Sequence, residues 1–493
     1  MSDPHSTSNG VGASLTALAV VVQGLWLARL YPNAHLDADL LSYLAYYRDW
    51  SGGSASSFGY TVPKVLPVAL FGPTGSPEAS FLLSLGAAAF GGAMAFLLAA
   101  RLFGPGVAVL ASIAYVFDPL RSILTLRSSA DLFVGVGLLA AMYALSVRAV
   151  LWAGVAILFA ALAKPLALVC GLAVLVVPGT RAVRRVAAAA LPLLALPAVA
   201  GLDAMLEGRS AIAGIFAMRL PDEHEAFVRV AQGAPLEMLE SLEMLFVDWF
   251  GTLLFARTWP LVLIGVVLYA GRSFLAWRSR GWEKESGLSR VDAGLVVLAM
   301  PVLLTAAYLA LALLEPFVFF TRFFWILSAA LTILAAYGAI AVASYAPLPR
   351  AGRAVLVGVF ALALLADRWD DFRWRKQLML DPFETHAALA ARGVDVIAAD
   401  ERCDGPAVVP LAYLPLAAWR SPDKLHRGQL CAMEDWAAGR GCEDATCVLV
   451  MPAAPTTALA REAASRLLGS DGAVLVSDRQ GALMRVEGRG SRT

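Results

Sequence analysis

Charged residues are scarce in this chain. Only 16% of its 493 residues are Asp, Glu, Lys or Arg, while 59% are hydrophobic. A soluble globular domain carries about 25% charged residues, so this composition excludes an ordinary soluble protein and indicates a multi-pass membrane protein. The charges also nearly cancel, leaving a net charge of +1. Binding to nucleic acid needs a concentrated basic surface, so we expect no nucleic-acid partner.

Cysteine is rarer still, with five residues. Cys170 stands alone in an apolar segment, and the other four gather near the C-terminus, at Cys403, Cys431, Cys442 and Cys447. Four cysteines in a small polar region predict either two disulfides or a zinc site. The spacing of the last two is not CxxC, and His426 is the only imidazole nearby, so we favour disulfides. Disulfides place this region in an oxidising compartment.

We also expect no cleavable secretion signal. The first sixteen residues contain no Lys or Arg, although a signal peptide begins with a basic segment. The first apolar stretch, residues 11–31, is long enough to stay in the membrane as an anchor.

Long apolar segments are what the sequence has in abundance. A spanning helix needs about 20 mainly apolar residues. Read with that window, the sequence predicts an all-α membrane domain over residues 1–367 with about eleven transmembrane helices. The candidate spans are 11–31, 79–100, 105–120, 131–147, 150–163, 166–178, 186–202, 251–270, 292–313, 323–344 and 353–367.

The composition changes at about residue 368. Cys447-Val-Leu-Val-Met and Ala473-Val-Leu-Val are short apolar runs typical of buried strands, as is the run at 407–411. Residues 456–468 favour a helix. We therefore expect residues 368–493 to form a small α/β domain.

Basic residues predict the orientation in the membrane. If the N-terminus is cytoplasmic, the short cytoplasmic loops hold a set of basic residues opposed only by Glu283 and Glu285, and the other side receives nearly every acid, as the positive-inside rule requires. The basic residues are Arg101, Arg148, Arg181, Arg184, Arg185, Arg272, Arg278, Arg280, Lys284, Arg350 and Arg353. An odd number of spans then exports the C-terminal domain, in agreement with its cysteines. We expect an inner-membrane protein with a cytoplasmic N-terminus and an extracytoplasmic C-terminal domain.

Two acids follow the first apolar segment closely, Asp37 and Asp39. Carboxylates beside a membrane are costly to desolvate, so chemistry is one reason to keep them there. One of them can act as a general base, or both can hold a divalent cation such as Mg²⁺ or Mn²⁺. The simpler alternative is that they cap the helix that follows. Leu40, Leu44 and Tyr47 show the spacing of an amphipathic helix at the membrane surface.

Several further motifs follow this one in order. They are Phe58-Gly-Tyr-Thr-Val-Pro-Lys-Val-Leu-Pro, Arg101-Leu-Phe-Gly, Asp131-Leu-Phe, the Leu-Ala-Lys-Pro stretch that ends at Pro165, and Phe320-Thr-Arg-Phe-Phe-Trp. Over residues 11–345, this order resembles the GT-C superfamily of membrane glycosyltransferases, which includes protein O-mannosyltransferases and lipid A aminoarabinose transferases. The chain has Asp-Ala-Asp where many relatives have adjacent acids, and it lacks prolines after Arg322. The resemblance therefore leaves the sugar open.

The resemblance implies a GT-C-type fold and a transferase that uses a sugar on a polyprenyl-phosphate lipid. The acceptor would be a glycan, lipid or protein outside the cytoplasm. Asp37 takes the role of catalytic acid/base, and Asp39 supports it or shares a metal. Lys64 and Arg322 are candidates to hold the donor phosphate, and Lys164 is a candidate to line the pocket.

Each binding candidate has a plainer alternative. Lys64 can reach the interface as an anchor, Arg322 can end a helix there or pair with Glu315, and Lys164 can mark a turn. Asp131 and Arg127 can pair with each other structurally. Two other functions remain open. The first is a transporter or flippase for a lipid-linked saccharide, which internal repeats and charges at mid-membrane depth would favour. The second is a non-catalytic envelope assembly protein.

Overall fold

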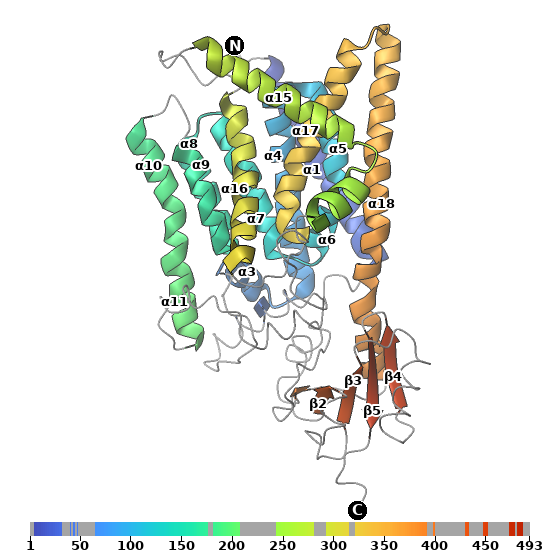
Figure 1. Cartoon of the computed structure of the whole chain (residues 1–493). Coiled ribbons are helices and arrows are strands. Elements are labelled where there is room, and N and C mark those ends of the chain that lie inside the picture. Colours follow the sequence, from blue (N-terminus) through green and yellow to red (C-terminus); the bar gives the residue numbers. More distant parts are fainter. Residues whose placement is uncertain are drawn as a thin grey trace, which may run out of the picture.

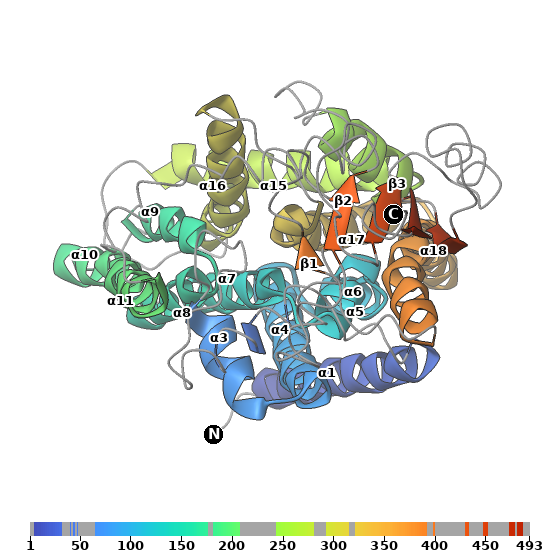
Figure 2. The same ribbon diagram turned by 90° about the horizontal axis from the view of Figure 1, so that it is seen from below.

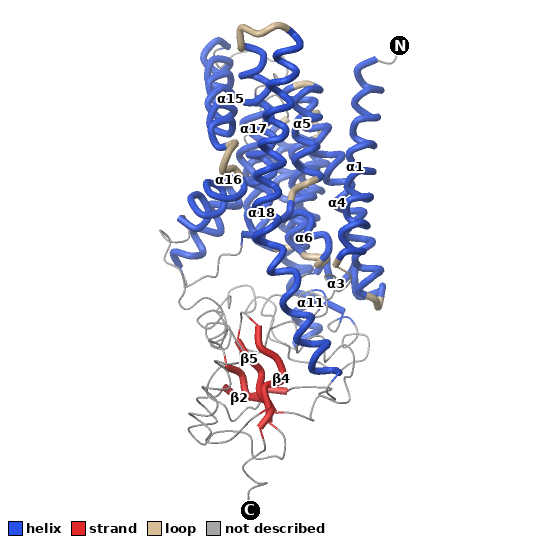
Figure 3. Tube along the Cα trace, turned by 90° about the vertical axis from the view of Figure 1, so that its right-hand side faces the viewer, coloured by secondary structure: helices blue, strands red, loops and turns tan. Residues whose placement is uncertain are grey.

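A computed structural model describes most of the apolar part of the chain and the strands that follow it. The described residues are 4–31, 40, 43–44, 47, 65–175, 181–207, 243–280, 292–314, 321–391, 398–399, 429–432, 447–451, 473–478 and 481–486. The helices form one bundle, and the N-terminus and the β-sheet lie at its opposite ends (Figure 1). Figure 3 shows the strands below the bundle, beside the end of the long helix Arg350–Ala391, which contacts the sheet.

The first part of the bundle comprises the elements before residue 208. Its long elements are α1 (Pro4–Leu30), α4 (Pro77–Phe103), α5 (Pro105–Val116), α7 (Ala130–Ser146), α8 (Val150–Ala163) and α11 (Ala195–Glu207). Its short elements are α3 (Val65–Phe71), η1 (Gly72–Thr74), α6 (Pro119–Leu126), η2 (Pro165–Cys170), α9 (Gly171–Leu175), α10 (Ala182–Ala190) and η3 (Leu191–Leu194).

The second part begins with an 11-residue π-helix, η4 (Met244–Leu254). It continues with α15 (Trp259–Arg280), α16 (Asp292–Leu314), η5 (Thr321–Phe324), α17 (Trp325–Tyr345) and α18 (Arg350–Ala391). Viewed from below, α10 and α11 lie at one edge of the bundle and α18 at another, with α7 between them (Figure 2).

The membrane character predicted from composition is confirmed. Within the described residues, four helices are long and apolar enough to cross a membrane, or up to five if α5 and α6 form one bent span. The four are Ser8–Leu30, Pro77–Phe103, Ala182–Gly201 and Arg322–Tyr345. Side chains such as Leu15, Leu18 and Trp26 on α1 point outward, 58–61% exposed, as contact with lipid tails requires. The predicted total of about eleven spans stays a prediction.

The span expected at 105–120 ends early. Helix α5 stops at Val116, and α6 continues at an angle of 52°. The cause is local: Asp118 caps α6 by accepting from the backbone N–H of Arg121, and Pro119 follows at the first helical position. The buried Arg121 side chain donates a hydrogen bond to the carbonyl oxygen of Val116 at 2.7 Å. This carbonyl lies at the end of α5, where the helix no longer supplies a backbone donor.

Glycines let the central helices approach closely. A Cβ atom at Gly338 of α17 would collide with the backbone carbonyl of Leu261, and one at Gly265 of α15 with the carbonyl of Leu334. Small residues at such crossings bring backbones together in membrane bundles, where packing rather than hydrophobicity drives association.

Helix α18 is attached to the bundle by charged groups. The buried carboxylate of Asp367 accepts from the backbone and side chain of both Arg257 and Thr258, at 2.7–3.2 Å. Arg257 also reaches Asp370 at 2.6 Å. The span expected at 353–367 is the first part of this helix, which runs on without interruption past residue 368 to Ala391.

Five strands form one sheet in the order β1-β2-β3-β5-β4. They are β1 (Ala398–Ala399), β2 (Gln429–Ala432), β3 (Cys447–Met451), β4 (Ala473–Asp478) and β5 (Gly481–Val486). The first three are parallel, and β5 pairs antiparallel with β3 and β4. The strands predicted at 447 and 473 are present. The segments 407–411 and 456–468 lie outside the described residues, so the α/β class of this region stays a prediction.

Candidate functional site

Three charged side chains from distant parts of the chain meet beside α7. Asp131 lies in the first turn of α7, Lys164 joins α8 to η2, and Arg322 lies in η5 before α17. The Nζ atom of Lys164 is 2.7 Å from Oδ1 of Asp131, and Nε of Arg322 is 3.5 Å from Oδ2. We call these three residues the charged cluster.

Two turn motifs place Asp131. Helix α6 ends at Leu126. Two residues later, Ser128 has a positive φ of 49° and donates its backbone N–H to the carbonyl oxygen of Thr125, which turns the chain sharply. Ser129 then caps α7, because its hydroxyl accepts from the backbone N–H of Asp131 at 3.3 Å. A carboxylate in the first turn of a helix is also favoured by the helix dipole.

A proline places Lys164. Pro165 cannot continue α8, so the helix ends at Ala163 and Lys164 takes an extended conformation with φ −154° and ψ 111°. Helices α7 and α8 pack against each other as neighbours joined by a short turn. The end of α8 therefore returns to the level where α7 begins.

Aromatic rings border the charged cluster. Lys164 Nζ lies 3.4 Å from the ring centroid of Phe323 and 5.3 Å from that of Tyr308. These two rings stack on each other with centroids 4.9 Å apart. Ring faces attract cations and hold them in place. The side chain of Asp131 is 6% exposed, that of Lys164 16% and that of Arg322 28%, so the cluster is mostly buried but open on the arginine side.

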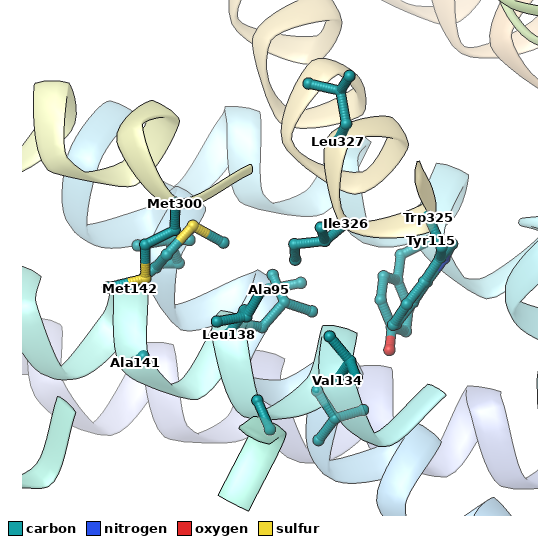
Figure 4. Close-up of a cluster of buried hydrophobic side chains, with 14 of the residues drawn as sticks. Ala95, Tyr115, Val134, Leu138, Ala141, Met142, Met300, Trp325, Ile326 and Leu327 are labelled. Atoms are coloured by element: carbon teal, nitrogen blue, oxygen red, sulfur yellow. The ribbon is translucent and has the colours of Figure 1, made fainter. Parts of the chain in front are cut away.

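A glycine in α7 allows Arg322 to approach Asp131. Gly135 lies one turn after Asp131, and a Cβ atom there would collide with the ring of Trp325. Trp325 is the first residue of α17 and directly follows η5. Figure 4 shows its ring beside Tyr115, above Val134 of α7. Glycine thus allows η5 to settle against the start of α7.

We expect Gly135→Ala to weaken the binding of an anionic lipid probe at the charged cluster by about tenfold and to destabilise the fold by about 1–3 kcal/mol, the usual cost of overpacking. The added methyl group must push Trp325 away, and Arg322 moves with it. Gly86→Ala on α4 is the matched control, because nothing lies within 4 Å of a Cβ atom at Gly86. Thermal unfolding in detergent and lipid binding would check both variants. Equal thermal stability and equal lipid binding in the two variants would contradict the proposed packing of Trp325 against Gly135.

Among the described residues, the charged cluster combines two cations with one carboxylate inside an apolar bundle. Such a set binds an anion through charge-assisted hydrogen bonds, and phosphate suits both Lys and Arg. No group of three or more His, Cys, Asp or Glu side chains that could hold a metal ion occurs within the part of the chain that the structure describes.

No protein-family model matches the chain. No curated protein matches it either. The chain is similar to ArnT. Two solved structures of ArnT from Cupriavidus metallidurans align with 94% of this chain and 97% of their own. The one bound to undecaprenyl phosphate has 13% identity and a TM-score of 0.46, and the apo structure has 14% and 0.48. Identity this low leaves the reaction to be argued from the site.

Two of the predicted binding residues, Lys164 and Arg322, are brought together. Asp37, Asp39 and Lys64 lie outside the described residues. The residue after Asp39, Leu40, is fully buried. The ring of Tyr43 stacks on that of Phe71, and the ring centroids of Phe71 and of Phe133 in α7 are 5.5 Å apart. The segment that follows the aspartates therefore packs close to the start of α7.

Sequence reasoning missed the centre of the cluster. The sequence offered Asp131 only as a structural partner for Arg127, whereas the structure places its carboxylate against Lys164 and Arg322. A signal was present, since only Asp131, Arg148 and Lys164 are charged between residues 128 and 180. If α7 and α8 form an antiparallel pair, the first and last of these lie at the same end.

Proposed function

We propose that the chain is a membrane glycosyltransferase that takes a sugar from a polyprenyl-phosphate donor and transfers it to an acceptor outside the cytoplasm. The observation that carries the proposal is the charged cluster. Lys164 and Arg322 converge from the ends of α8 and α17 on one carboxylate, at a partly open position inside an apolar bundle. A small soluble anion gains nothing from the apolar surroundings of this site. A phosphate on a lipid does, because its hydrocarbon tail is solvated by the apolar helices and the membrane.

The donor phosphate would bind between Lys164 and Arg322. Arg322 is the more exposed of the two and offers a planar set of donors, while Lys164 offers a compact charge fixed over the Phe323 ring. Both cations would stabilise the negative charge that grows on the phosphate as the sugar leaves. A lipid carrier is also chemically reasonable, since nucleotide sugars are made in the cytoplasm and the acceptor is outside.

Asp37 and Asp39 complete the proposed chemistry. Asp37 accepts the proton of the acceptor hydroxyl, and Asp39 supports it. Lys64 is proposed as a further phosphate ligand. The aspartate pair is also proposed to hold a divalent cation, Mg²⁺ or Mn²⁺. Transfer should then stop when the metal is chelated and return when the metal is added back.

The charge distribution supports the proposed orientation. Helix α4 ends, and helices α10 and α18 begin, at the end of the bundle where the N-terminus lies, whereas α7 and α17 begin at the end that faces the sheet (Figure 1). Arg101 is in the last turn of α4, Arg181 is the N-cap residue of α10, and Arg350 is the first residue of α18. By the positive-inside rule the first end is cytoplasmic. The charged cluster and the C-terminal domain are then outside, in an inner-membrane protein.

Native mass spectrometry of the protein in mild detergent tests the proposal. We expect the purified wild type to carry or to bind a polyprenyl phosphate or its glycoside, with undecaprenyl phosphate as the added probe. Arg322→Ala should lose at least tenfold in affinity, because one charge-assisted contact is removed. The mass of a bound glycoside identifies the sugar. Equal binding by wild type and variant would remove the charged cluster from donor recognition and favour a transporter or an assembly protein.

A further inference from the structure

The carboxylate of Asp131 occupies the position between the two cations that bind phosphate in the proposed function, on which this inference rests. We propose that Asp131 is a counter-ion that repels the phosphate. It thereby lowers the affinity of the site for the more highly charged product more than its affinity for the singly charged donor.

The geometry leaves a phosphate little room to avoid Asp131. Its two oxygens lie 2.7 Å from Lys164 Nζ and 3.5 Å from Arg322 Nε. A phosphate that contacts both nitrogens must therefore displace the carboxylate or lie within a few ångströms of it. The turn at Ser128 and the cap at Ser129 fix the backbone of Asp131, so the carboxylate can rotate but cannot leave.

The surroundings strengthen this repulsion. Asp131 is 6% exposed, and the rings of Phe323 and Tyr308 border the cluster. Charges interact more strongly where water is excluded, because the effective dielectric constant is lower. Like charges in such a site disfavour each other more than they would at the protein surface.

The charge of the ligand changes during transfer. The donor is a phosphodiester with one negative charge. The acceptor oxygen forms a bond to the anomeric carbon, and the bond from that carbon to the phosphate oxygen breaks. The phosphate oxygen keeps the electron pair, and the acceptor proton passes to the base. The product is a phosphomonoester with a second pKa of about 6, so at neutral pH it carries nearly two charges. Repulsion by Asp131 therefore rises once the sugar has left, and this favours release of the spent lipid.

A second role for Asp131 predicts the opposite sign. If the carboxylate serves only to hold Lys164 and Arg322 in place, its removal lets the cations separate and weakens binding of any phosphate. The effect of one substitution on affinity therefore distinguishes a repelling counter-ion from a scaffold.

The experiment compares two lipid probes, undecaprenyl phosphate and its methyl phosphodiester, by titration in detergent with native mass spectrometry. The proteins are wild type, Asp131→Asn, Lys164→Gln and Glu78→Gln. The last removes an exposed carboxylate from the first turn of α4 and controls for net charge. We expect Asp131→Asn to bind the monoester about tenfold more tightly. Repulsion scales with ligand charge, so the diester should gain only about threefold. Glu78→Gln should leave both affinities unchanged.

Each other outcome decides a different point. Weaker binding of both probes by Asp131→Asn would overturn the inference and make Asp131 a scaffold. Equal gains for the two probes would overturn the discrimination between product and donor. Unchanged binding in Lys164→Gln would instead count against the proposed function, because the cluster would then not hold phosphate at all.

Discussion

Replacing Lys164 by glutamine is expected to reduce sugar transfer by about hundredfold or more. Lys164 is the cation closest to Asp131, at 2.7 Å, and its charge in the proposed site faces the phosphate that becomes more negative as the sugar leaves. Removing one donor to a developing negative charge typically costs 10²–10³ in rate. The measurement is transfer in proteoliposomes with the donor that native mass spectrometry identifies.

A fold defect would produce the same loss, so the variant needs a matched partner. Lys164→Gln alone leaves the 6% exposed carboxylate of Asp131 with less compensation, and uncompensated buried charge destabilises proteins strongly. The double variant Lys164→Gln with Asp131→Asn removes that carboxylate charge. We expect it to recover thermal stability but not transfer. Lys164→Arg keeps the charge and should retain more activity than the glutamine variant.

The double variant also gives the decisive outcome. If it regains both stability and transfer, Lys164 acts only as the structural partner of Asp131. The phosphate would then have to be bound by other groups, and the plainer interpretation of Lys164-Pro165 as a turn would be correct.

The sequence predicted the parts of this fold that depend on local composition. Apolar stretches and proline positions were sufficient to locate most helix ends, including the break at Pro165. Local patterns failed where distant segments decide the structure. The π-helix Met244–Leu254 has no period that marks it in one sequence. The fully buried Arg121 was also missed, because its partners include Gln23 at 2.7 Å, which lies 98 positions earlier.

The candidate site shows the same division. The family resemblance was enough to propose Arg322 as a phosphate ligand and Lys164 as a residue that lines the pocket. Their meeting point was not predictable, because Arg322 lies 191 positions after Asp131, and their approach depends on Gly135 accepting the ring of Trp325. A helix-capping aspartate and a site aspartate look identical in sequence, so only packing could distinguish the two for Asp131.

Asp37→Asn is expected to abolish transfer, with a loss of at least about 10³, while donor binding stays within about threefold of wild type. A general base typically contributes 10²–10⁴, and asparagine cannot accept the proton of the acceptor hydroxyl. This combination separates Asp37 from Lys164 and Arg322, whose loss should weaken binding as well. It also separates catalysis from capping, since asparagine caps helices about as well as aspartate and should leave the thermal stability unchanged.

Asp39→Asn extends the test to the supporting acid. If Asp39 shares a metal with Asp37, its variant should need more Mg²⁺ or Mn²⁺ for the same rate, and excess metal should restore part of the transfer. Without a metal, the loss should be smaller than for Asp37→Asn and indifferent to metal. If cells in which both aspartates are replaced together keep the wild-type phenotype, Asp37 and Asp39 take no part in a transfer reaction. The charged cluster would then serve a transporter or an assembly protein, because binding a lipid phosphate requires cations but no base.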